Sequence, residues 1–213
     1  MSLNASGRLC VWAAALLATA AGLPALEGQD KGATQPTATR TPSPPPRMED
    51  TLARSSAASQ PGPEHRWLEP LIGSWKIEMT WYSPGAPTLR TSGTSENRWI
   101  LGGRFVLAEA AAGEGPTAIE DKTLYGYDRW ERKFFSLGLR TVGAGLTQDW
   151  GFYDPVSRSF ALSGKDRDQA TGRLGVHRQL IKVLGPDRYS IEVFADVPQR
   201  RPLKVLEIGF TRR

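Results

Sequence analysis

The chain has 213 residues, of which 39% are hydrophobic, and it carries a formal net charge of +5 at pH 7. Basic residues alternate with acidic ones and form no stripe with interleaved aromatic residues, so nucleic-acid binding is not expected. The single cysteine, Cys10, and the two histidines offer neither a thiol catalyst in the folded domain nor the usual ligands of a zinc site. We therefore expect one domain that needs no metal and no other cofactor.

An apolar run opens the chain over residues 9–23, directly after the positive charge of Arg8, and it contains an Ala-Thr-Ala sequence at 18–20. This arrangement is typical of a secretory signal peptide. The run is shorter than the roughly 20 residues that a spanning helix needs, which disfavours an uncleaved membrane anchor. We expect residues 1–20 to be removed and the mature protein to be periplasmic or secreted, without stable insertion into a membrane.

Residues 21–62 are rich in proline, serine and threonine and poor in aromatic residues. Such a segment cannot bury enough apolar surface to offset the entropy lost on ordering. We expect a disordered linker that tethers the domain and is extended where proline is frequent. As an alternative, the proline-rich stretch 42–46 could serve as a polyproline ligand for a partner protein.

The folded domain is expected over residues 63–213, and it begins with a short helix at 63–71. The following segment, 73–82, alternates strictly between apolar and polar residues. One face carries Trp75, Ile77, Met79 and Trp81. A period of two over this length predicts a half-buried strand.

Further strand-like segments follow, separated by turn-forming residues. They cover residues 89–100, 104–111, 122–127, 133–140, 145–153, 159–164, 175–184, 189–195 and 203–211. Two hairpins share the sequence Tyr-Asp-x-x-x-Arg-x-Phe, beginning at Tyr127 and Tyr153, and this repeat suits a meander of antiparallel strands. The segments predict an all-β fold, a single antiparallel up-and-down β-barrel of about 8–10 strands with a short N-terminal helix, because closure removes exposed strand edges. A barrel of this size can hold one small ligand.

Three motifs carry a resemblance to a known family: Leu-Ile-Gly-Ser-Trp at 71–75, Arg-Trp-Ile-Leu-Gly-Gly-Arg-Phe at 98–105 and Gly-Tyr-Asp at 126–128. In this order they resemble a bacterial lipocalin-like family known as domain of unknown function 1579 (DUF1579), over about residues 64–212. The resemblance implies a calycin-type β-barrel and no established activity. It also implies that an arginine of the last strand, Arg212 or Arg213, packs on Trp75 as a cation–π contact and closes one end of the barrel.

His177 is predicted to face the barrel interior, because it shares a strand face with Gln179, Ile181 and Val183. An inward histidine could ligate haem iron or act as an acid or base. The simpler interpretation, which we favour, is a hydrogen-bonded residue of the barrel wall.

Arg98 and Arg104 form a second candidate site, with Glu96 on the strand face of Arg98. If these arginines face the lumen, they can anchor a carboxylate or phosphate through bidentate hydrogen bonds. If they face solvent, they form ordinary cross-strand ion pairs. Eight aromatic residues are expected to fill the barrel core or to line an apolar cavity: Trp75, Trp81, Trp99, Phe105, Tyr125, Phe135, Trp150 and Phe152.

These features predict a protein that binds a small apolar or amphipathic molecule at a site made of Trp75, Trp99, Arg98, Arg104 and His177. No catalytic motif is recognisable, and an enzyme that uses His177, Glu78 or Arg98 for acid–base chemistry is the first alternative. The remaining alternatives are a haem-binding barrel and a packed interaction module without a ligand. Besides a small molecule, the partner considered is a second copy of the chain in a homodimer. Inward carboxylates or a histidine beside a pocket would favour the enzyme, whereas an aromatic cavity without titratable pairs would favour the binder. A filled lumen would favour the interaction module.

Overall fold

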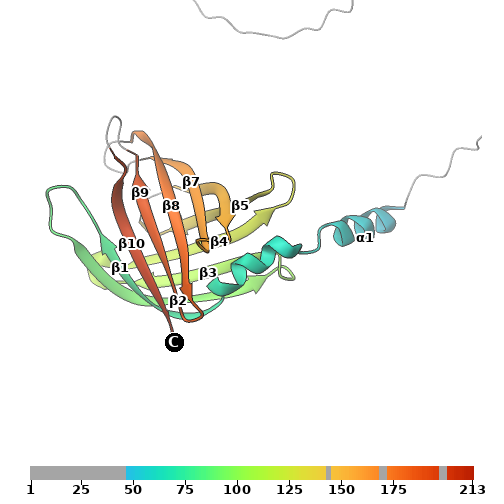
Figure 1. Ribbon diagram of the computed structural model, residues 1–213, viewed down its shortest axis with the longest axis horizontal. Coiled ribbons are helices and arrows are strands. Elements are labelled where there is room, and N and C mark those ends of the chain that lie inside the picture. The colour runs from blue at the N-terminus through green and yellow to red at the C-terminus, as the bar shows by residue number, and fades with distance from the viewer. Residues whose placement is uncertain (1–46, 143–144, 168–171, 197–200) are drawn as a thin grey trace, which may run out of the picture. The chain divides into compact units, whose positions relative to one another are not determined.

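The computed structural model describes residues 47–142, 145–167, 172–196 and 201–213 (Figure 1). All described residues belong to one compact unit, residues 46–213. The predicted signal peptide and the predicted linker up to residue 46 lie outside the described residues. Within the described ranges, no helix is both long enough and apolar enough to cross a membrane.

A helix, α1 (Met48–Ala58), precedes the barrel. It lies within residues 21–62, where the sequence predicts a disordered linker, so the structure differs from that prediction over these 11 residues. The reason is local, because the segment contains neither proline nor glycine and carries Glu49 and Asp50 in its first turn, where acidic groups favour the positive end of the helix dipole. The described side chains of α1 are exposed, and the helix therefore depends on its own propensity more than on packing.

A 3-10 helix, η1 (Pro63–Leu71), occupies the residues for which the sequence predicts a short helix. One side of it is buried and consists of His65, Leu68 and Leu71. His65 Nδ1 accepts a hydrogen bond from the amide of Gly62 at 3.0 Å, and burial lowers the pKa of His65. The imidazole also meets the ring of Tyr127 edge-on, so η1 packs on the end of the barrel.

Ten strands form one closed antiparallel barrel, in which each strand pairs with its neighbours in the chain and β1 pairs with β10 (Figure 1). The strands are β1 (Gly73–Trp81), β2 (Leu89–Ile100), β3 (Phe105–Ala112), β4 (Ile119–Asp128), β5 (Lys133–Arg140), β6 (Thr147–Asp154), β7 (Ser159–Arg167), β8 (Leu174–Gly185), β9 (Arg188–Ala195) and β10 (Leu203–Arg212). A short 3-10 turn, η2 (Gly115–Thr117), lies between β3 and β4. The predicted up-and-down barrel is confirmed, and its closure pairs the strand edges that would otherwise be exposed.

Alternate connections of a meander lie at the same end of the barrel. The β2–β3, β4–β5, β6–β7 and β8–β9 connections share one end with η1 and with the last residues of β10. We call this the closed end. The remaining connections surround the opposite end, the open end, which lies toward the upper left of Figure 1.

Trp75 plugs the closed end of the barrel. Its side chain is fully buried, its indole N–H donates to the carbonyl oxygen of Leu71 at 3.1 Å, and the ring of Tyr189 meets it edge-on at 4.8 Å. The guanidinium of Arg212 lies 4.4 Å from the centre of the indole. The cation–π contact implied by the family resemblance is therefore confirmed, and it is made by Arg212.

Four of the eight aromatic residues assigned to the interior lie on the outer face instead: Phe105, Phe135, Trp150 and Phe152. Phe105 alternates with the inward, fully buried Val106. The rings of Phe105 and Phe135 lie 6.1 Å apart and cover Gly126, where even a Cβ atom would lie 2.5 Å from Phe135. The prediction was wrong for Phe105 and Phe135 because β3 and β5 carry apolar residues on both faces, and a period of two does not tell which face is inward. In β6 the inward positions go to small or polar residues such as Asp149 and Gly151, so Trp150 and Phe152 face outward.

Candidate functional site

A cavity of about 100 Å³ lies inside the open half of the barrel. The inward positions of β3 facing this cavity are three alanines, Ala108, Ala110 and Ala112. Large side chains such as Phe160 and Ile181 are almost fully buried in the core. An alanine side chain ends at Cβ, so β3 leaves a space that bulkier residues would fill, large enough for several water molecules or a small ligand.

The wall of this cavity has an apolar side and a polar side. The apolar side combines the β3 alanines with side chains of β1, β9 and β10: Met79, Trp81, Ile191, Val193, Leu206 and Ile208. The polar side comes from β4, β5 and β8: Asp121, Thr123, Tyr125, Arg140 and Gln179. A molecule in the cavity therefore meets hydrocarbon on one side and hydrogen-bonding groups on the other.

Asp121 and Arg140 form an ion pair on the polar side. Arg140 Nε lies 3.4 Å from a carboxylate oxygen of Asp121, and Arg140 also donates to the hydroxyl of Thr147 at 3.1 Å. The hydroxyl of Thr123 donates to Asp121 at 2.6 Å. Because the two charges offset each other, this part of the wall is polar without a large net charge.

Three neighbouring strands bring Asp149, Gly164 and His177 side by side. Asp149 is opposite Gly164 in the β6–β7 ladder, and Gly164 is opposite His177 in the β7–β8 ladder. His177 Nε2 lies 2.6 Å from Asp149 Oδ1, so the two side chains meet across the glycine. A Cβ atom on Gly164 would lie 2.1 Å from that same oxygen, and a side chain at position 164 would therefore force the pair apart.

The Asp149–His177 pair is largely shielded from solvent, with side-chain exposures of 6% and 16%. Contact with the Asp149 carboxylate raises the pKa of His177, and burial, which lowers it, is the smaller effect. The hydroxyl of Ser136 lies 3.2 Å from Asp149 Oδ2 and 3.1 Å from Oε1 of Gln179. Since Gln179 lines the cavity, Ser136 connects the pair to the cavity wall.

Tyr125 supplies a neutral hydrogen-bonding group on the polar side. Burial raises the pKa of its phenol, and the nearby Asp121 carboxylate adds to that rise. The phenol therefore keeps its proton at neutral pH and remains available as a donor.

Three of the five predicted site residues are inward, but they do not form one site. Trp75 belongs to the closed end, and Trp99 packs against the core. Neither is among the residues that line the cavity. His177 is inward, as predicted, and adjoins the cavity through Ser136 and Gln179. That Trp75, Trp99 and His177 contact a ligand stays a prediction.

Arg98 and Arg104 lie outside the lumen, so the expectation that they anchor a ligand there is corrected. Because Asn97 and Trp99 are the inward residues of β2, Arg98 faces outward and pairs with Glu109 of β3, which is the cross-strand alternative. Arg104 donates to the carbonyl oxygen of Ser59 at 2.9 Å. Glu78, the carboxylate considered for an enzyme, is likewise exposed on the outer face.

Asp121, Thr123 and Arg140 of the cavity wall were missed from the sequence, as were the alanines of β3. Their signal was present, since small residues recur at every second position from Ala108 to Ala112. Asp121 and Asp149 each occupy an inward position in a strand. The sequence does not show the register between paired strands, and the site arises from the residues that this register places side by side.

Comparisons with known proteins identify the family. A family profile described as a protein of unknown function, DUF1579, matches residues 60–212. Among solved structures, an S-type phycobiliprotein lyase from Guillardia theta is 12% identical, with coverage of 79% of this chain and 98% of that chain and a TM-score of 0.48. No match was found among curated proteins. Since the profile covers most of the chain and includes all three motifs that carry the resemblance, the chain belongs to the DUF1579 family.

Proposed function

We propose that the protein binds one small amphipathic molecule in the cavity of the barrel. The observation that carries this proposal is the division of one cavity wall into an apolar and a polar side. Ligand sites are typically apolar cavities with a few convergent polar groups. The apolar body of the molecule would lie against the β3 alanines, and its polar group would lie near Thr123, Tyr125 and Gln179.

The charges on the wall favour a hydrogen-bonding ligand group over a strongly charged one. Asp121 is already paired with Arg140, and Asp149 is already paired with His177. A ligand with a full charge would have to compete with one of these pairs. A hydroxyl, carbonyl or amide group can instead use the remaining donors and acceptors without separating charges.

Native mass spectrometry of the protein purified from its producing cell tests the proposal, because the mass of a retained ligand appears whatever its chemical identity. We expect a bound species in the wild type and its loss in Ala110→Leu, whose side chain points into the cavity. The matched control is Ala111→Leu, the next residue of β3, which is exposed on the outer face and should retain the ligand. Titration of both variants with 1-naphthol provides a defined small amphiphile as a second measurement. Absence of any retained species together with no 1-naphthol binding, or equal binding in the two variants, would refute the proposal.

An acid–base enzyme is the second candidate, and the Asp149–His177 pair favours it. A histidine and carboxylates beside a pocket are the features that distinguish this candidate from a plain binder, and the structure contains them. Native mass spectrometry of the retained compound also distinguishes the enzyme from the binder. An enzyme that lacks His177 would hold its unconverted substrate. A retained compound of different mass in His177→Gln supports the enzyme, and an unchanged mass supports the binder.

The haem-binding alternative depends on His177, whose Nε2 is directed at Asp149. An axial ligand would have to leave that carboxylate or use its other ring nitrogen. The absence of haem binding stays a prediction. Titration with ferric haem should give no saturable change in the absorption band, and a change abolished in His177→Ala would establish the alternative.

A further inference from the structure

The open end of the barrel carries exposed aliphatic side chains beside the cavity mouth. Six of them lie at the ends of β5, β8 and β10 or in the connection between β5 and β6: Leu139, Val142, Leu146, Leu174, Val176 and Leu203. Their exposed fractions range from 39% for Val176 and Leu203 to 59% for Leu174. Leu174 and Val176 alternate with the inward His177 and Gln179, so they point away from the lumen. We call these six residues the aliphatic edge.

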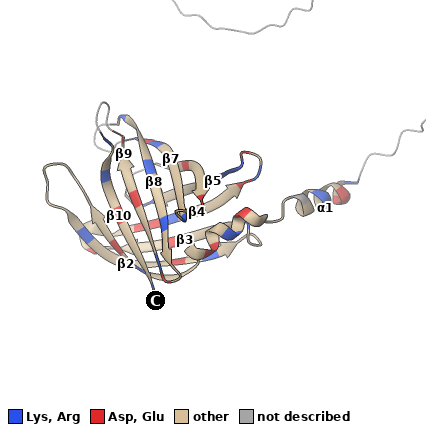
Figure 2. Ribbon diagram, viewed as in Figure 1, with Lys and Arg blue, Asp and Glu red and all other residues tan. Residues whose placement is uncertain are grey.

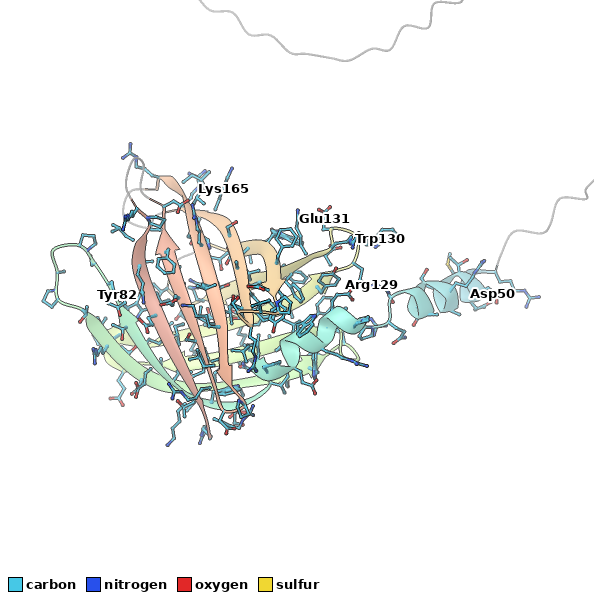
Figure 3. The ribbon with its side chains drawn as sticks, in the orientation of Figure 1. Asp50, Tyr82, Arg129, Trp130, Glu131 and Lys165 are labelled. Carbon is cyan, nitrogen blue, oxygen red and sulfur yellow. The ribbon has the colours of Figure 1, made fainter. Side chains whose placement is uncertain are left out.

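Cationic side chains lie between the members of the aliphatic edge: Lys165, Arg167, Arg173, Arg178 and Arg201. Figure 3 shows Lys165 at the upper end of the barrel, and Figure 2 shows further Lys and Arg residues at this end. Three described acidic residues lie at this edge: Asp166, Asp196 and Glu120, whose backbone pairs with Thr141. Asp196 pairs with Arg178 at 3.0 Å. The edge therefore combines exposed hydrocarbon with an excess of positive charge.

We propose that the aliphatic edge docks the protein on the surface of an anionic lipid bilayer, with the cavity mouth toward the lipid. Leu203 of β10 and His177 of β8 both pair with Ala195 of β9, so the members of the aliphatic edge on β8 and β10 lie close together and can meet one surface. Aliphatic groups enter the boundary between headgroups and acyl chains, while Lys and Arg remain at the level of the phosphates. An amphipathic molecule then passes between the bilayer and the cavity. This passage rests on the proposed function, whereas docking does not.

The closed end provides a control surface on the same molecule. Trp130 and Val156 are 96% and 92% exposed, each at the tip of a separate hairpin. In both turns an aspartate accepts the amide of the exposed residue, at 2.8 Å from Trp130 to Asp128 and at 3.0 Å from Val156 to Asp154. These two side chains are more exposed than those of the aliphatic edge, and they lie away from the cavity mouth. Nonspecific hydrophobic adsorption to vesicles would therefore depend on Trp130 and Val156 at least as strongly as on the aliphatic edge.

Vesicle flotation with the protein purified from its producing cell tests the docking. The vesicles contain phosphatidylglycerol and phosphatidylethanolamine, or phosphatidylcholine alone. The edge variant combines Leu139→Thr, Leu174→Thr and Val176→Thr, because threonine keeps a high strand propensity. The control variant combines Trp130→Thr and Val156→Thr. All three proteins share one N-terminus, so differences between them report on the substituted surfaces.

We expect the wild type and the control variant to float with anionic vesicles, and the edge variant to bind at least fivefold more weakly. Binding to phosphatidylcholine should be weaker, and added salt should weaken binding to anionic vesicles. A circular dichroism spectrum and a urea unfolding midpoint that match those of the wild type show that the edge variant is folded. No flotation of the wild type, or an equal loss in both variants, overturns the docking proposal. If the vesicle results hold but 1-naphthol binds none of the proteins, the docking stands and the proposed cavity function fails.

Discussion

Replacement of Trp75 by alanine tests the account of the closed end most directly. The indole is fully buried and touches three elements, because it donates to Leu71 of η1, meets Tyr189 of β9 and lies under Arg212 of β10. Loss of this side chain therefore removes packing that joins the first strand to the last two and to the preceding helix.

The magnitude follows from these contacts. Truncation of a buried aromatic side chain to alanine costs about 3–5 kcal/mol, and loss of the cation–π contact with Arg212 adds about 0.5–1 kcal/mol. The carbonyl oxygen of Leu71 is not left without a donor, since Asn97 Nδ2 also donates to it at 2.7 Å. We expect Trp75→Ala to lower the free energy of unfolding by about 3.5–6 kcal/mol. For Trp75→Phe, which retains most of the apolar volume, we expect about 1–2 kcal/mol.

Equilibrium unfolding in urea, followed by circular dichroism, measures both differences. The matched control is Trp130→Ala, because Trp130 is 96% exposed and its replacement should change stability by less than about 0.5 kcal/mol. A loss below about 1 kcal/mol for Trp75→Ala would mean that the indole does not close the barrel. If Trp130→Ala lost as much stability as Trp75→Ala, the difference in unfolding free energy would not reflect burial of the replaced side chain.

Three further expectations follow from the structure. Gly164→Ala should destabilise the fold by about 1–3 kcal/mol through overpacking, because the new Cβ would lie 2.1 Å from an Asp149 oxygen. Gly175→Ala in β8, where a Cβ meets nothing within 4 Å, should be close to neutral in the same denaturant assay. Because contact with Asp149 raises the pKa of His177 above its ordinary 6.5, the folded state binds this proton more tightly than the unfolded chain does. The resulting stabilisation is complete below about pH 6.5 and is lost as the pH rises through the folded pKa. The stability difference between wild type and His177→Gln should therefore shrink over this range, and a difference that is constant from about pH 5 to 9 would contradict the linkage. N-terminal sequencing of the protein from its producing cell should begin near Ala21, and a chain that still starts at Met1 would contradict export.

The architecture of the barrel was predictable because its signals are local. Alternation places Trp75, Ile77 and Met79 on one face of β1, and all three are buried. The repeated hairpin sequence predicts aspartates that accept turn amides, and Asp128 and Asp154 do so. Turn residues between the segments separate them into ten strands, and a meander needs no further information about strand order.

The candidate site was predictable only in part. The inward orientation of His177 follows from the strand face that it shares with Gln179 and Ile181, but the identity of its partner, Asp149, does not. Arg98 was considered for the lumen, whereas its neighbours Asn97 and Trp99 occupy the inward positions of β2. The polar side of the cavity depends on residues that were not singled out, among them Asp121 and Asp149.

The sequence by itself determined the all-β class, the succession of strands, the family and the aromatic plug of the closed end, because period, turn chemistry and motif are properties of contiguous residues. Tertiary structure alone decided which face of a doubly apolar strand is inward, and it brought Asp149 against His177 across Gly164. It also determined that three alanines of one strand lie opposite large side chains of others and so leave a cavity. These outcomes depend on the register between paired strands and on the curvature of the closed sheet. Both arise only when all strands pack together.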